Sequence, residues 1–463
     1  GPAGLAAAWE ARRHNLSCEV LEKDHCVGGL SRTVNYKGYR FDIGGHRFFT
    51  KNIEVNAFWQ EILKDDFISV NRLSRIYYNN RFFYYPLKPM NAFLGLGPIA
   101  SVQILLSYVK ARMAPLPEEN TFEQWVTNRF GRKLYETFFK TYTEKVWGIP
   151  CSQIGAEWAA QRIKGLSLTS AVKNALFGSR GNRVKTLIST FQYPKEGPGM
   201  MYSAASDSIR SSGGDVSLNS EVMAIHHAEG RIREITVRDP ESGRTRRLGG
   251  DQFLSSMPIT HLVERLVPAP PDPVLRAAHS LKYRALLVVN LVLRRKNLFP
   301  DNWVYVHSPQ VRLGRLQNYK NWSPWMIDNQ EHTSLGLEYF CNEGDDLWTM
   351  PNEQLIELGG REIQTLGLAR VSDVMDGFVY RAPFTYCVYD TGYEQHMKIV
   401  REYLARFPNL HPIGRAGMFK YNNMDHSILT GFLAVRNIMG ARHDLWSVNA
   451  DQDYHEEDRG SET

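Results

Sequence analysis

The chain has 463 residues, of which 43% are hydrophobic and 12% are aromatic. This is enough apolar material for two or three domains with cores of their own, and it excludes a disordered chain. The formal net charge of +6 is small and its basic residues are dispersed, which argues against nucleic-acid binding and suits an anionic small molecule. The five cysteines show no CxxC spacing, so we expect reduced thiols, no metal site and a cytoplasmic protein.

The start of the chain has the pattern of a dinucleotide-binding βαβ unit. Gly1 and Gly4 keep the spacing of the last two glycines of a G-x-G-x-x-G loop, whose strand and first glycine we expect upstream. Residues 5–11 predict a helix, and residues 18–21 predict a strand that ends at Glu22. Such glycines let the backbone approach a pyrophosphate at the helix N-terminus, and the acid accepts hydrogen bonds from a ribose.

A second glycine pair, Gly28-Gly29, follows Glu22 and leads to Arg32. An acid, a glycine pair and an arginine in this order are typical of large FAD-binding flavoproteins rather than of NAD-dependent dehydrogenases. Ordinary turns are the alternative interpretation of the glycines. We predict FAD as the cofactor, and this part of the chain would bind it through Gly1, Gly4, Glu22, Gly28, Gly29, Leu30, Ser31 and Arg32.

The next region, residues 51–175, has mostly helical patterns, including one from Thr121 to Tyr142. Residues 92–109 form the most apolar run, but glycines, a proline and polar residues interrupt it. A packed helix is therefore predicted there rather than a membrane span, with membrane contact as the alternative. Residues 176–186 lose apolar periodicity and are rich in small polar residues, so we expect a mobile lid.

The second half of the chain alternates between strands and helices. Residues 216–222 and 232–237 predict strands, residues 280–400 predict several more, and a last helix should begin after Asn423. The predicted fold is α/β, with a discontinuous Rossmann-like FAD-binding domain, a helical insert and a mixed β-sheet insert. The expected domains are residues 1–50, 191–275 and 405–440 for FAD, 51–190 as a helical substrate and lid domain, 276–404 as a mixed-sheet substrate domain, and 441–463 as a polar tail.

Several residues outside the first segment are candidates for the flavin site. His46 follows Gly44-Gly45 directly after the FAD-binding start, which distinguishes it from the other histidines. Asn423 would cap the last helix, whose positive N-terminal end would stabilise a reduced flavin. The further predicted cofactor-binding residues are Gly45, His46, Val222, Gly414, Arg415, Asn423 and Met424.

Four motifs carry a more specific resemblance. They are Gly44-Gly45-His46, residues 138–148 (FFKTYTEKVWG), residues 281–286 (LKYRAL) and residues 414–425 (GRAGMFKYNNMD). In this order they resemble segments of the UDP-galactopyranose mutases, within the wider amine oxidase and protoporphyrinogen oxidase group of flavoproteins.

The resemblance implies a pyranose/furanose mutase of a nucleotide-diphosphate sugar that acts through an adduct between N5 of reduced FAD and the sugar. Phe138 and Phe139 would line the base pocket, Tyr142 and Trp147 would border the sugar and flavin, and Arg162 would precede the mobile loop. Arg284 and Arg415 would clamp the diphosphate, with Tyr386 and Tyr421 donating to its oxygens. The implied catalytic residues are His46, Arg284, Arg415 and Trp147.

The chemistry of these side chains agrees with that interpretation. Guanidinium groups bind phosphate oxygens with charge-assisted bidentate bonds, and aromatic faces stack on a base. Arg284 lies in an apolar strand, where a buried guanidinium needs an anion. The alternative is that each aromatic residue belongs to the core and each arginine to a surface ion pair.

The sequence also departs from the mutase pattern at Phe49, Leu166, Cys387 and Asn423, which leaves the sugar and the base open. The alternative function is an FAD-dependent oxidoreductase or desaturase of the protoporphyrinogen oxidase type with an apolar substrate. A non-catalytic FAD-bound protein is a third. NAD(P)H is a candidate reductant, and a homodimer is a candidate assembly.

Overall fold

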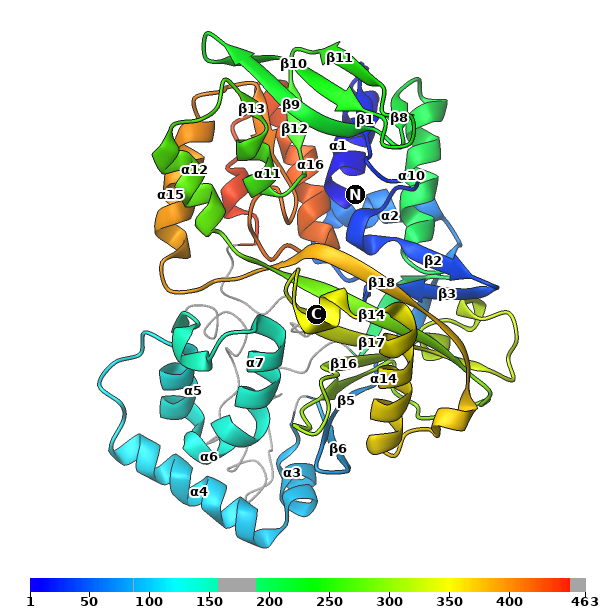
Figure 1. Cartoon of the computed structure of the whole chain (residues 1–463), viewed down its shortest axis with the longest axis vertical. Helices are drawn as coiled ribbons and strands as arrows, with labels where there is room; N and C mark the ends of the chain where they lie inside the picture. The colour runs from blue at the N-terminus through cyan, green and yellow to red at the C-terminus, as the bar shows by residue number, and fades with distance from the viewer. Residues whose placement is uncertain (86, 157–188, 450–463) are drawn as a thin grey trace, which may run out of the picture.

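The structure is a computed structural model that describes residues 1–85, 87–156 and 189–449. Three layers follow one another along its long axis (Figure 1). A dinucleotide-binding region lies at one end, a seven-stranded sheet lies in the middle, and a group of helices lies at the other end. The α/β fold class expected from the sequence is confirmed.

The dinucleotide-binding region is built from segments far apart in the sequence. Its strands are short parallel pairs, β1 (Glu19–Leu21) with β8 (Asp215–Ser217) and β12 (Phe253–Ser255) with β19 (Leu410–Pro412). Its helices are α1 (Pro2–Arg13), α2 (Ile53–Leu63), α10 (Gly199–Ser211) and α16 (Met424–Ile438). Helix α2 packs here, although the sequence analysis assigned its residues to the helical insert.

Small residues let α1 and α16 pack closely. A Cβ atom on Gly431 would lie 2.5 Å from the carbonyl oxygen of Ala3 and 2.9 Å from the backbone nitrogen of Ala7. Only glycine therefore fits on the α16 side of this contact. The close packing holds the first turns of α1 against the middle of α16, and the N-terminal residues of both helices line the same cavity.

A four-stranded sheet covers the outer end of this region. Its order is β11 (Thr245–Gly249), β10 (Arg231–Arg238), β9 (Glu221–Ala228) and β13 (Leu266–Val267). The expectation of one strand over residues 216–222 was wrong, because Asn219 has a left-handed φ of 48° and separates β8 from β9. The helices beside it are α11 (Ile259–Glu264), α12 (Asp272–Ser280) and α15 (Tyr393–Leu404).

The central sheet is mixed, as expected. Its order is β18 (Val374–Cys387), β14 (Tyr283–Leu293), β17 (Thr333–Cys341), β16 (Arg315–Asn318), β15 (Trp303–Val306), β5 (Ser74–Tyr78) and β6 (Arg81–Tyr84). Strands β15 and β5 are parallel and the other neighbours are antiparallel. Helix α14 (Asn352–Thr365) buries Leu355 and Ile363 against the sheet, and α13 (Asp346–Thr349) precedes it.

Two antiparallel strand pairs lie outside the larger sheets. Strands β2 (Thr33–Tyr36) and β3 (Tyr39–Asp42) form an antiparallel pair, and β4 (Phe67–Asn71) pairs with β7 (Thr190–Pro194). The sequence analysis expected helices from residue 51, but β4, β5 and β6 occupy residues 67–84. Strands β5 and β6 extend the central sheet instead of joining the helices.

The helices of the far end are shorter than the sequence pattern predicts. They are α3 (Pro89–Leu96), α4 (Pro98–Met113), α5 (Phe122–Phe130), α6 (Arg132–Leu134), a π-helical turn (Tyr135–Lys140) and α7 (Thr141–Trp147). The helix expected over residues 121–142 is broken at Gly131, whose φ is +82°. A Cβ atom on Gly131 would lie 2.7 Å from the backbone nitrogen of Tyr108 in α4.

The apolar run 92–109 differs from its prediction as well. It forms parts of two helices separated at Gly97, and much of its apolar surface is exposed rather than packed. No helix in the described ranges is long and apolar enough to cross a membrane. The predicted lid at residues 176–186, Arg162 and the end of the polar tail lie outside the described residues.

Candidate active site

A cavity of about 1510 Å³ runs from the dinucleotide-binding region to the face of the central sheet. One end is lined by α1, β1 and the residues around Gly29, and the other by β15, β16 and β18. Sixteen predicted site residues line it: Gly1, Gly4, Glu22, Gly29, Leu30, Ser31, Arg32, Gly45, His46, Val222, Tyr386, Gly414, Arg415, Tyr421, Asn423 and Met424.

The first end of the cavity is formed by two glycine loops in contact. A Cβ atom on Gly29 would lie 3.3 Å from the Cα atom of Gly1, and the φ of Gly28 is +104°. Any side chain here would fill the space in front of the α1 N-terminus. The bare backbone and the helix end together form an anion-binding surface of the kind that accepts a pyrophosphate.

Acidic and basic side chains surround this loop. Glu22 follows β1 and accepts a hydrogen bond from the backbone N–H of Asp24 at 3.2 Å. Arg32 donates through Nε to the carbonyl of Gly29 at 2.9 Å and pairs with Asp24 through Nη1. Asp24 lines the cavity and was missed by the sequence analysis, although its place two residues after Glu22 was a usable signal.

Gly414 closes the cavity from the C-terminal side. Its φ is +78°, and a Cβ atom there would lie 2.9 Å from the Cβ atom of Ala3 in α1. Its N–H donates to Oγ1 of Thr430 at 2.9 Å, and its carbonyl accepts from Nδ2 of Asn422 at 3.0 Å. These contacts hold the loop that precedes α16. Helix α16 begins at Met424 with Asn423 as its N-cap residue, as the sequence analysis predicted.

Gly45 and His46 lie in the middle of the cavity wall. Nδ1 of His46 lies 3.3 Å from the carbonyl oxygen of Gly44. Burial, together with the positive charges of Arg415 and Arg315, lowers the pKa of His46 to about 4. His46 is therefore neutral at pH 7. A Cβ atom on Gly45 would lie 3.0 Å from Nε2 of Gln317, so glycine keeps this part of the cavity open.

Arg415 lies against two tyrosine rings. Its guanidinium carbon is 4.1 Å from the ring centroid of Tyr421 and 5.1 Å from that of Tyr386, and the two rings stack at 5.8 Å. Its Nε and Nη2 atoms are buried, and neither has a hydrogen-bond partner among the described residues. A buried guanidinium with unused donors, which lines the cavity, is suited to bind an anion there.

A second arginine in the cavity was missed by the sequence analysis. Arg315 on β16 makes a bidentate contact with Glu338 on β17, with Nε 2.9 Å from Oε1, and its Nη2 donates to the Tyr386 hydroxyl at 3.3 Å. Nε2 of Gln317 also donates to Glu338 at 2.6 Å. The sequence offered little signal, because these residues come together only when β16 and β17 pair.

Arg284, the other arginine of the predicted clamp, is not among the residues that line this cavity, and its role in the clamp stays a prediction. Its Nε donates to the carbonyl of Val146 at 3.2 Å, and its Nη2 donates to those of Lys145 at 3.3 Å and Phe340 at 2.8 Å. Nη1 lies 3.9 Å from Asp345. Carbonyl groups at the C-terminus of α7 and on β17, together with the carboxylate of Asp345, satisfy this buried guanidinium within the protein.

The two residues of the predicted base pocket lie in an aromatic cluster of the helical region, and their role toward a base stays a prediction. Phe138 is buried and meets Phe83 edge to face at 5.2 Å, and Phe139 stacks on Phe130 at 5.6 Å. Both lie on the π-helical turn and neither lines the cavity. Both rings pack in a hydrophobic core cluster, which is the alternative that the sequence analysis gave for the aromatic residues.

Tyr142 and Trp147 on α7 do not line the cavity either. Tyr142 stacks on His307 at 4.8 Å. The Trp147 ring lies 6.3 Å from that of Tyr386 and 6.5 Å from that of Tyr421. Trp147 therefore packs against the two tyrosine rings that contact the Arg415 guanidinium.

Two further observations complete the site. No group of three or more histidine, cysteine, aspartate or glutamate residues in the described ranges could hold a metal ion.

Burial lowers the pKa of Lys145 to about 8, and its ammonium group donates to the carbonyls of Ser308 at 2.7 Å and Leu313 at 3.0 Å. Lys145 thus ties α7 to the loop between β15 and β16.

Comparison with known proteins decides the family. A model of the flavin containing amine oxidoreductases matches residues 2–439, which is nearly the whole chain. The chain belongs to this family. FAD binding in this family requires a glycine-rich loop at a helix N-terminus and an acid after the next strand. The contacting glycine loops, the N-terminus of α1 and Glu22 after β1 supply these features, so the residues present fit FAD.

Solved structures share this fold. A reduced UDP-galactopyranose mutase is 21% identical with a TM-score of 0.82, over 98% of this chain and 96% of that chain. A protein assigned as a protoporphyrinogen oxidase from Exiguobacterium sp. 255-15 is 16% identical with a TM-score of 0.69, over 95% and 96%. Putrescine oxidase with bound putrescine is 15% identical with a TM-score of 0.62, over 95% and 97%.

Proposed function

We propose that the protein is an FAD-dependent mutase that interconverts the pyranose and furanose forms of a nucleotide-diphosphate sugar. The single observation that carries this proposal is the buried guanidinium of Arg415, whose Nε and Nη2 have no partner among the described residues. An apolar amine carries no anionic group that would need such a guanidinium. A diphosphate in the cavity would supply an anionic acceptor for this guanidinium.

FAD would be held by the residues at the glycine-loop end of the cavity and by the N-terminus of α16. Gly1, Gly4 and Gly29 would face its pyrophosphate, Glu22 a ribose, and Asn423 and Met424 the flavin ring. The reduced flavin would supply the nucleophile of the reaction, with NAD(P)H as a candidate source of electrons.

The chain's own residues would bind and orient the sugar nucleotide. Arg415 would neutralise charge on the diphosphate as the bond between it and the sugar breaks. The hydroxyls of Tyr386 and Tyr421 would donate to phosphate oxygens beside it. Arg315 carries a charge that Glu338 already balances, so it would orient the Tyr386 hydroxyl rather than bind the anion alone.

His46 would act as a neutral group. Since burial and two neighbouring arginines hold its pKa near 4, it can accept or donate a hydrogen bond near the flavin but does not add positive charge at pH 7. It therefore serves to position the cofactor or the sugar rather than to clamp the phosphate.

A second candidate function is an FAD-dependent oxidoreductase or desaturase of the protoporphyrinogen oxidase type. The position of Arg284 favours it, because Arg284 donates to backbone carbonyls and leaves Arg415 as the one arginine of the predicted clamp that lines the cavity. A substrate without phosphate groups would then use the aromatic wall formed by Trp303 and Tyr305.

One experiment separates the two functions. The FAD-loaded protein is reduced with dithionite without oxygen, incubated with a panel of UDP-, GDP- and dTDP-sugars, and the products are separated by chromatography. A mutase gives a new isomer of one sugar nucleotide without net consumption of reductant. Reoxidation of the flavin by an apolar acceptor, without isomerisation of any sugar nucleotide, would support the second candidate instead.

A further inference from the structure

Helix α4 carries an exposed apolar stripe. Its members are Ile99, Val102, Leu106, Val109 and Met113, each of which is exposed to solvent. With 100° of rotation per residue, all five lie within an arc of about 80° on one side of the helix. The opposite side, which includes Ile104 and Ala111, is buried against the protein. We call these five residues the α4 stripe.

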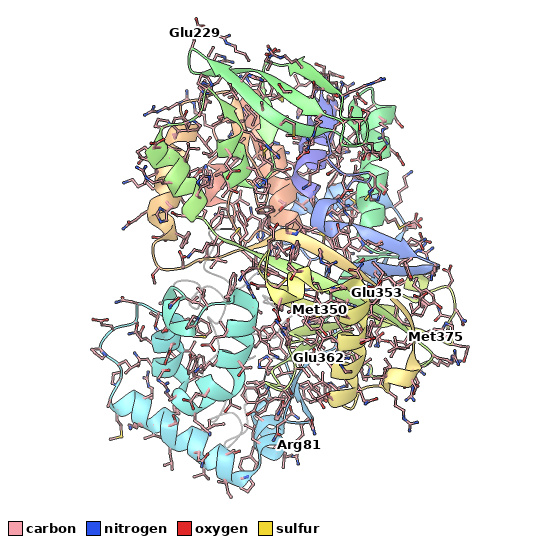
Figure 2. The ribbon with its side chains drawn as sticks, viewed as in Figure 1. Arg81, Glu229, Met350, Glu353, Glu362 and Met375 are labelled. Atoms are coloured by element: carbon pink, nitrogen blue, oxygen red, sulfur yellow. The ribbon has the colours of Figure 1, made fainter. Side chains whose placement is uncertain are left out.

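Helix α3 extends this surface. Met90, Phe93 and Leu94 are exposed there, and α3 packs beside α4. Arg81 on β6 holds the end of α3 in place, because its Nη1 donates to the carbonyls of Leu94 at 3.1 Å and Gly95 at 3.0 Å. Figure 2 shows Arg81 at the end of the molecule that Figure 1 shows to be opposite the four-stranded sheet. The apolar surface is thus displayed on a fixed support at one end of the protein.

The charged residues of α4 indicate which kind of partner suits this apolar surface. On the same helical projection, Lys110 and Arg112 flank the α4 stripe on its two sides. Neither makes an ion pair with any residue in the described part of the chain, and residues 88–116 contain no aspartate or glutamate. An apolar stripe between unpaired cations is the pattern of a helix that lies in the boundary of an anionic bilayer.

A second copy of the chain is a poorer match for the same surface. Two stripes in contact would gather Lys110 and Arg112 of both copies at one interface, and the segment 88–116 supplies no carboxylate to balance them. Large exposed apolar patches are uncommon on monomers, so the surface needs a partner.

We propose that α3 and α4 dock on the surface of a membrane that contains anionic phospholipids. The apolar side chains would enter the boundary between headgroups and acyl chains, and Lys110 and Arg112 would lie among the phosphates. The helices would lie on the membrane without crossing it. This inference does not depend on the proposed function, because it uses no residue of the cavity.

The test is sedimentation of the FAD-loaded protein with vesicles. Vesicles of phosphatidylcholine alone are compared with vesicles of equal parts phosphatidylcholine and phosphatidylglycerol. The wild type should sediment with the mixed vesicles, much less with phosphatidylcholine alone, and should be released by high salt. Ile99→Ser with Leu106→Ser should lower the vesicle affinity by about tenfold or more, because two large apolar side chains are lost.

Matched controls test whether vesicle binding depends on the α4 stripe and its flanking cations, rather than on any exposed apolar or charged residue. Ile53 on α2 is 85% exposed and belongs to the dinucleotide-binding region rather than to the layer of α3 and α4, so Ile53→Ser should bind vesicles like the wild type. Lys110→Glu with Arg112→Glu should abolish the preference for phosphatidylglycerol, while Lys51→Glu with Arg276→Glu should keep it. The flavin absorbance of each variant shows that it is folded.

Three outcomes would overturn the proposal. The first is that the wild type fails to sediment with the mixed vesicles at low salt. The second is that the two serine substitutions leave vesicle binding unchanged. The third is a dimer in light scattering that these substitutions dissociate, in a protein that does not bind vesicles, which would assign the α4 stripe to a second copy.

Discussion

The guanidinium of Arg415 lies 4.1 Å from the ring centroid of Tyr421, and this contact holds in place a cavity-lining arginine whose Nε and Nη2 have no hydrogen-bond partner among the described residues. The Tyr386 ring stacks on that of Tyr421 at 5.8 Å and also lies 5.1 Å from the Arg415 guanidinium carbon. Trp147 packs against both tyrosine rings. The aromatic residues at this site therefore act mainly by holding a cation in place. The resemblance instead implied that Trp147 would border the sugar and the flavin.

The first prediction concerns Tyr421. Tyr421→Phe keeps the ring that holds Arg415 and loses one hydroxyl donor, so nucleotide affinity should fall by about tenfold at most. Tyr421→Ala removes the ring as well and frees the guanidinium, so the loss should be clearly larger. Calorimetric titration of the reduced protein with UDP measures both. Equal losses in the two variants would show that the ring does not position Arg415.

The second prediction concerns Arg284. Arg284→Ala leaves the carbonyls of Val146, Lys145 and Phe340 without their donor, so the free energy of unfolding should fall by about 1–3 kcal/mol. Urea denaturation of the FAD-loaded protein measures this change. The affinity for UDP should stay within a few-fold of the wild type. A folded, fully stable variant that has lost UDP binding would support the clamp predicted from the sequence.

The third prediction concerns Gly414. A methyl group there would meet Ala3 at 2.9 Å, and its φ of +78° strains any other residue. Gly414→Ala should cost about 1–3 kcal/mol and should lower FAD occupancy, measured from the flavin absorbance. Gly243→Ala is the control, because Gly243 has a φ of +69° but no atom within 4 Å. The same loss of FAD in both variants would contradict the role assigned to the contact with α1.

The fourth prediction concerns the pH dependence of stability through Asp42. Its carboxyl group is buried, and burial raises its pKa from 3.8 to about 7 even though Tyr193 and Thr33 donate hydrogen bonds to it. The folded state therefore binds this proton more tightly than the unfolded state. Its contribution to stability is fully present below about pH 4 and is lost as the pH rises through about 7.

Asp42→Asn removes that titration. The stability of the wild type relative to the variant should therefore fall by about 2–4 kcal/mol between pH 4 and pH 8. Urea denaturation at several pH values measures the difference. A constant difference across this range would show that Asp42 titrates near its ordinary pKa.

The sequence predicted the parts of the fold that local pattern determines. The helix after Gly1, the strand before Glu22 and the helix after Asn423 all form where small residues, an acid and an N-cap residue indicated. These elements also carry the predicted FAD-binding residues, so that part of the site could be located from sequence alone. Asn219 and Gly131 break a predicted strand and helix through backbone conformations that the patterns did not include.

The parts that sequence could not supply depend on pairing between distant strands. Arg315 meets Glu338 only through the register of β16 with β17. Arg284 sits in an apolar strand as expected, but its partners are carbonyls at the end of α7 and on β17, which no spacing along the chain reveals. The exposure of the α4 stripe likewise depends on which neighbours cover it.

The central claim is that the cavity binds a diphosphate through Arg415, and calorimetry tests it most directly. UDP and GDP are titrated into the reduced, FAD-saturated wild type, into Arg415→Ala, and into Arg276→Ala, which removes the same charge from an exposed position on α12. We expect the wild type and Arg276→Ala to bind one of the two nucleotides. Arg415→Ala should bind it about 30-fold or more weakly, since a lost charged partner costs roughly 2–5 kcal/mol. A wild type that binds neither nucleotide, or an Arg415→Ala variant that binds as the wild type does, would contradict the claim.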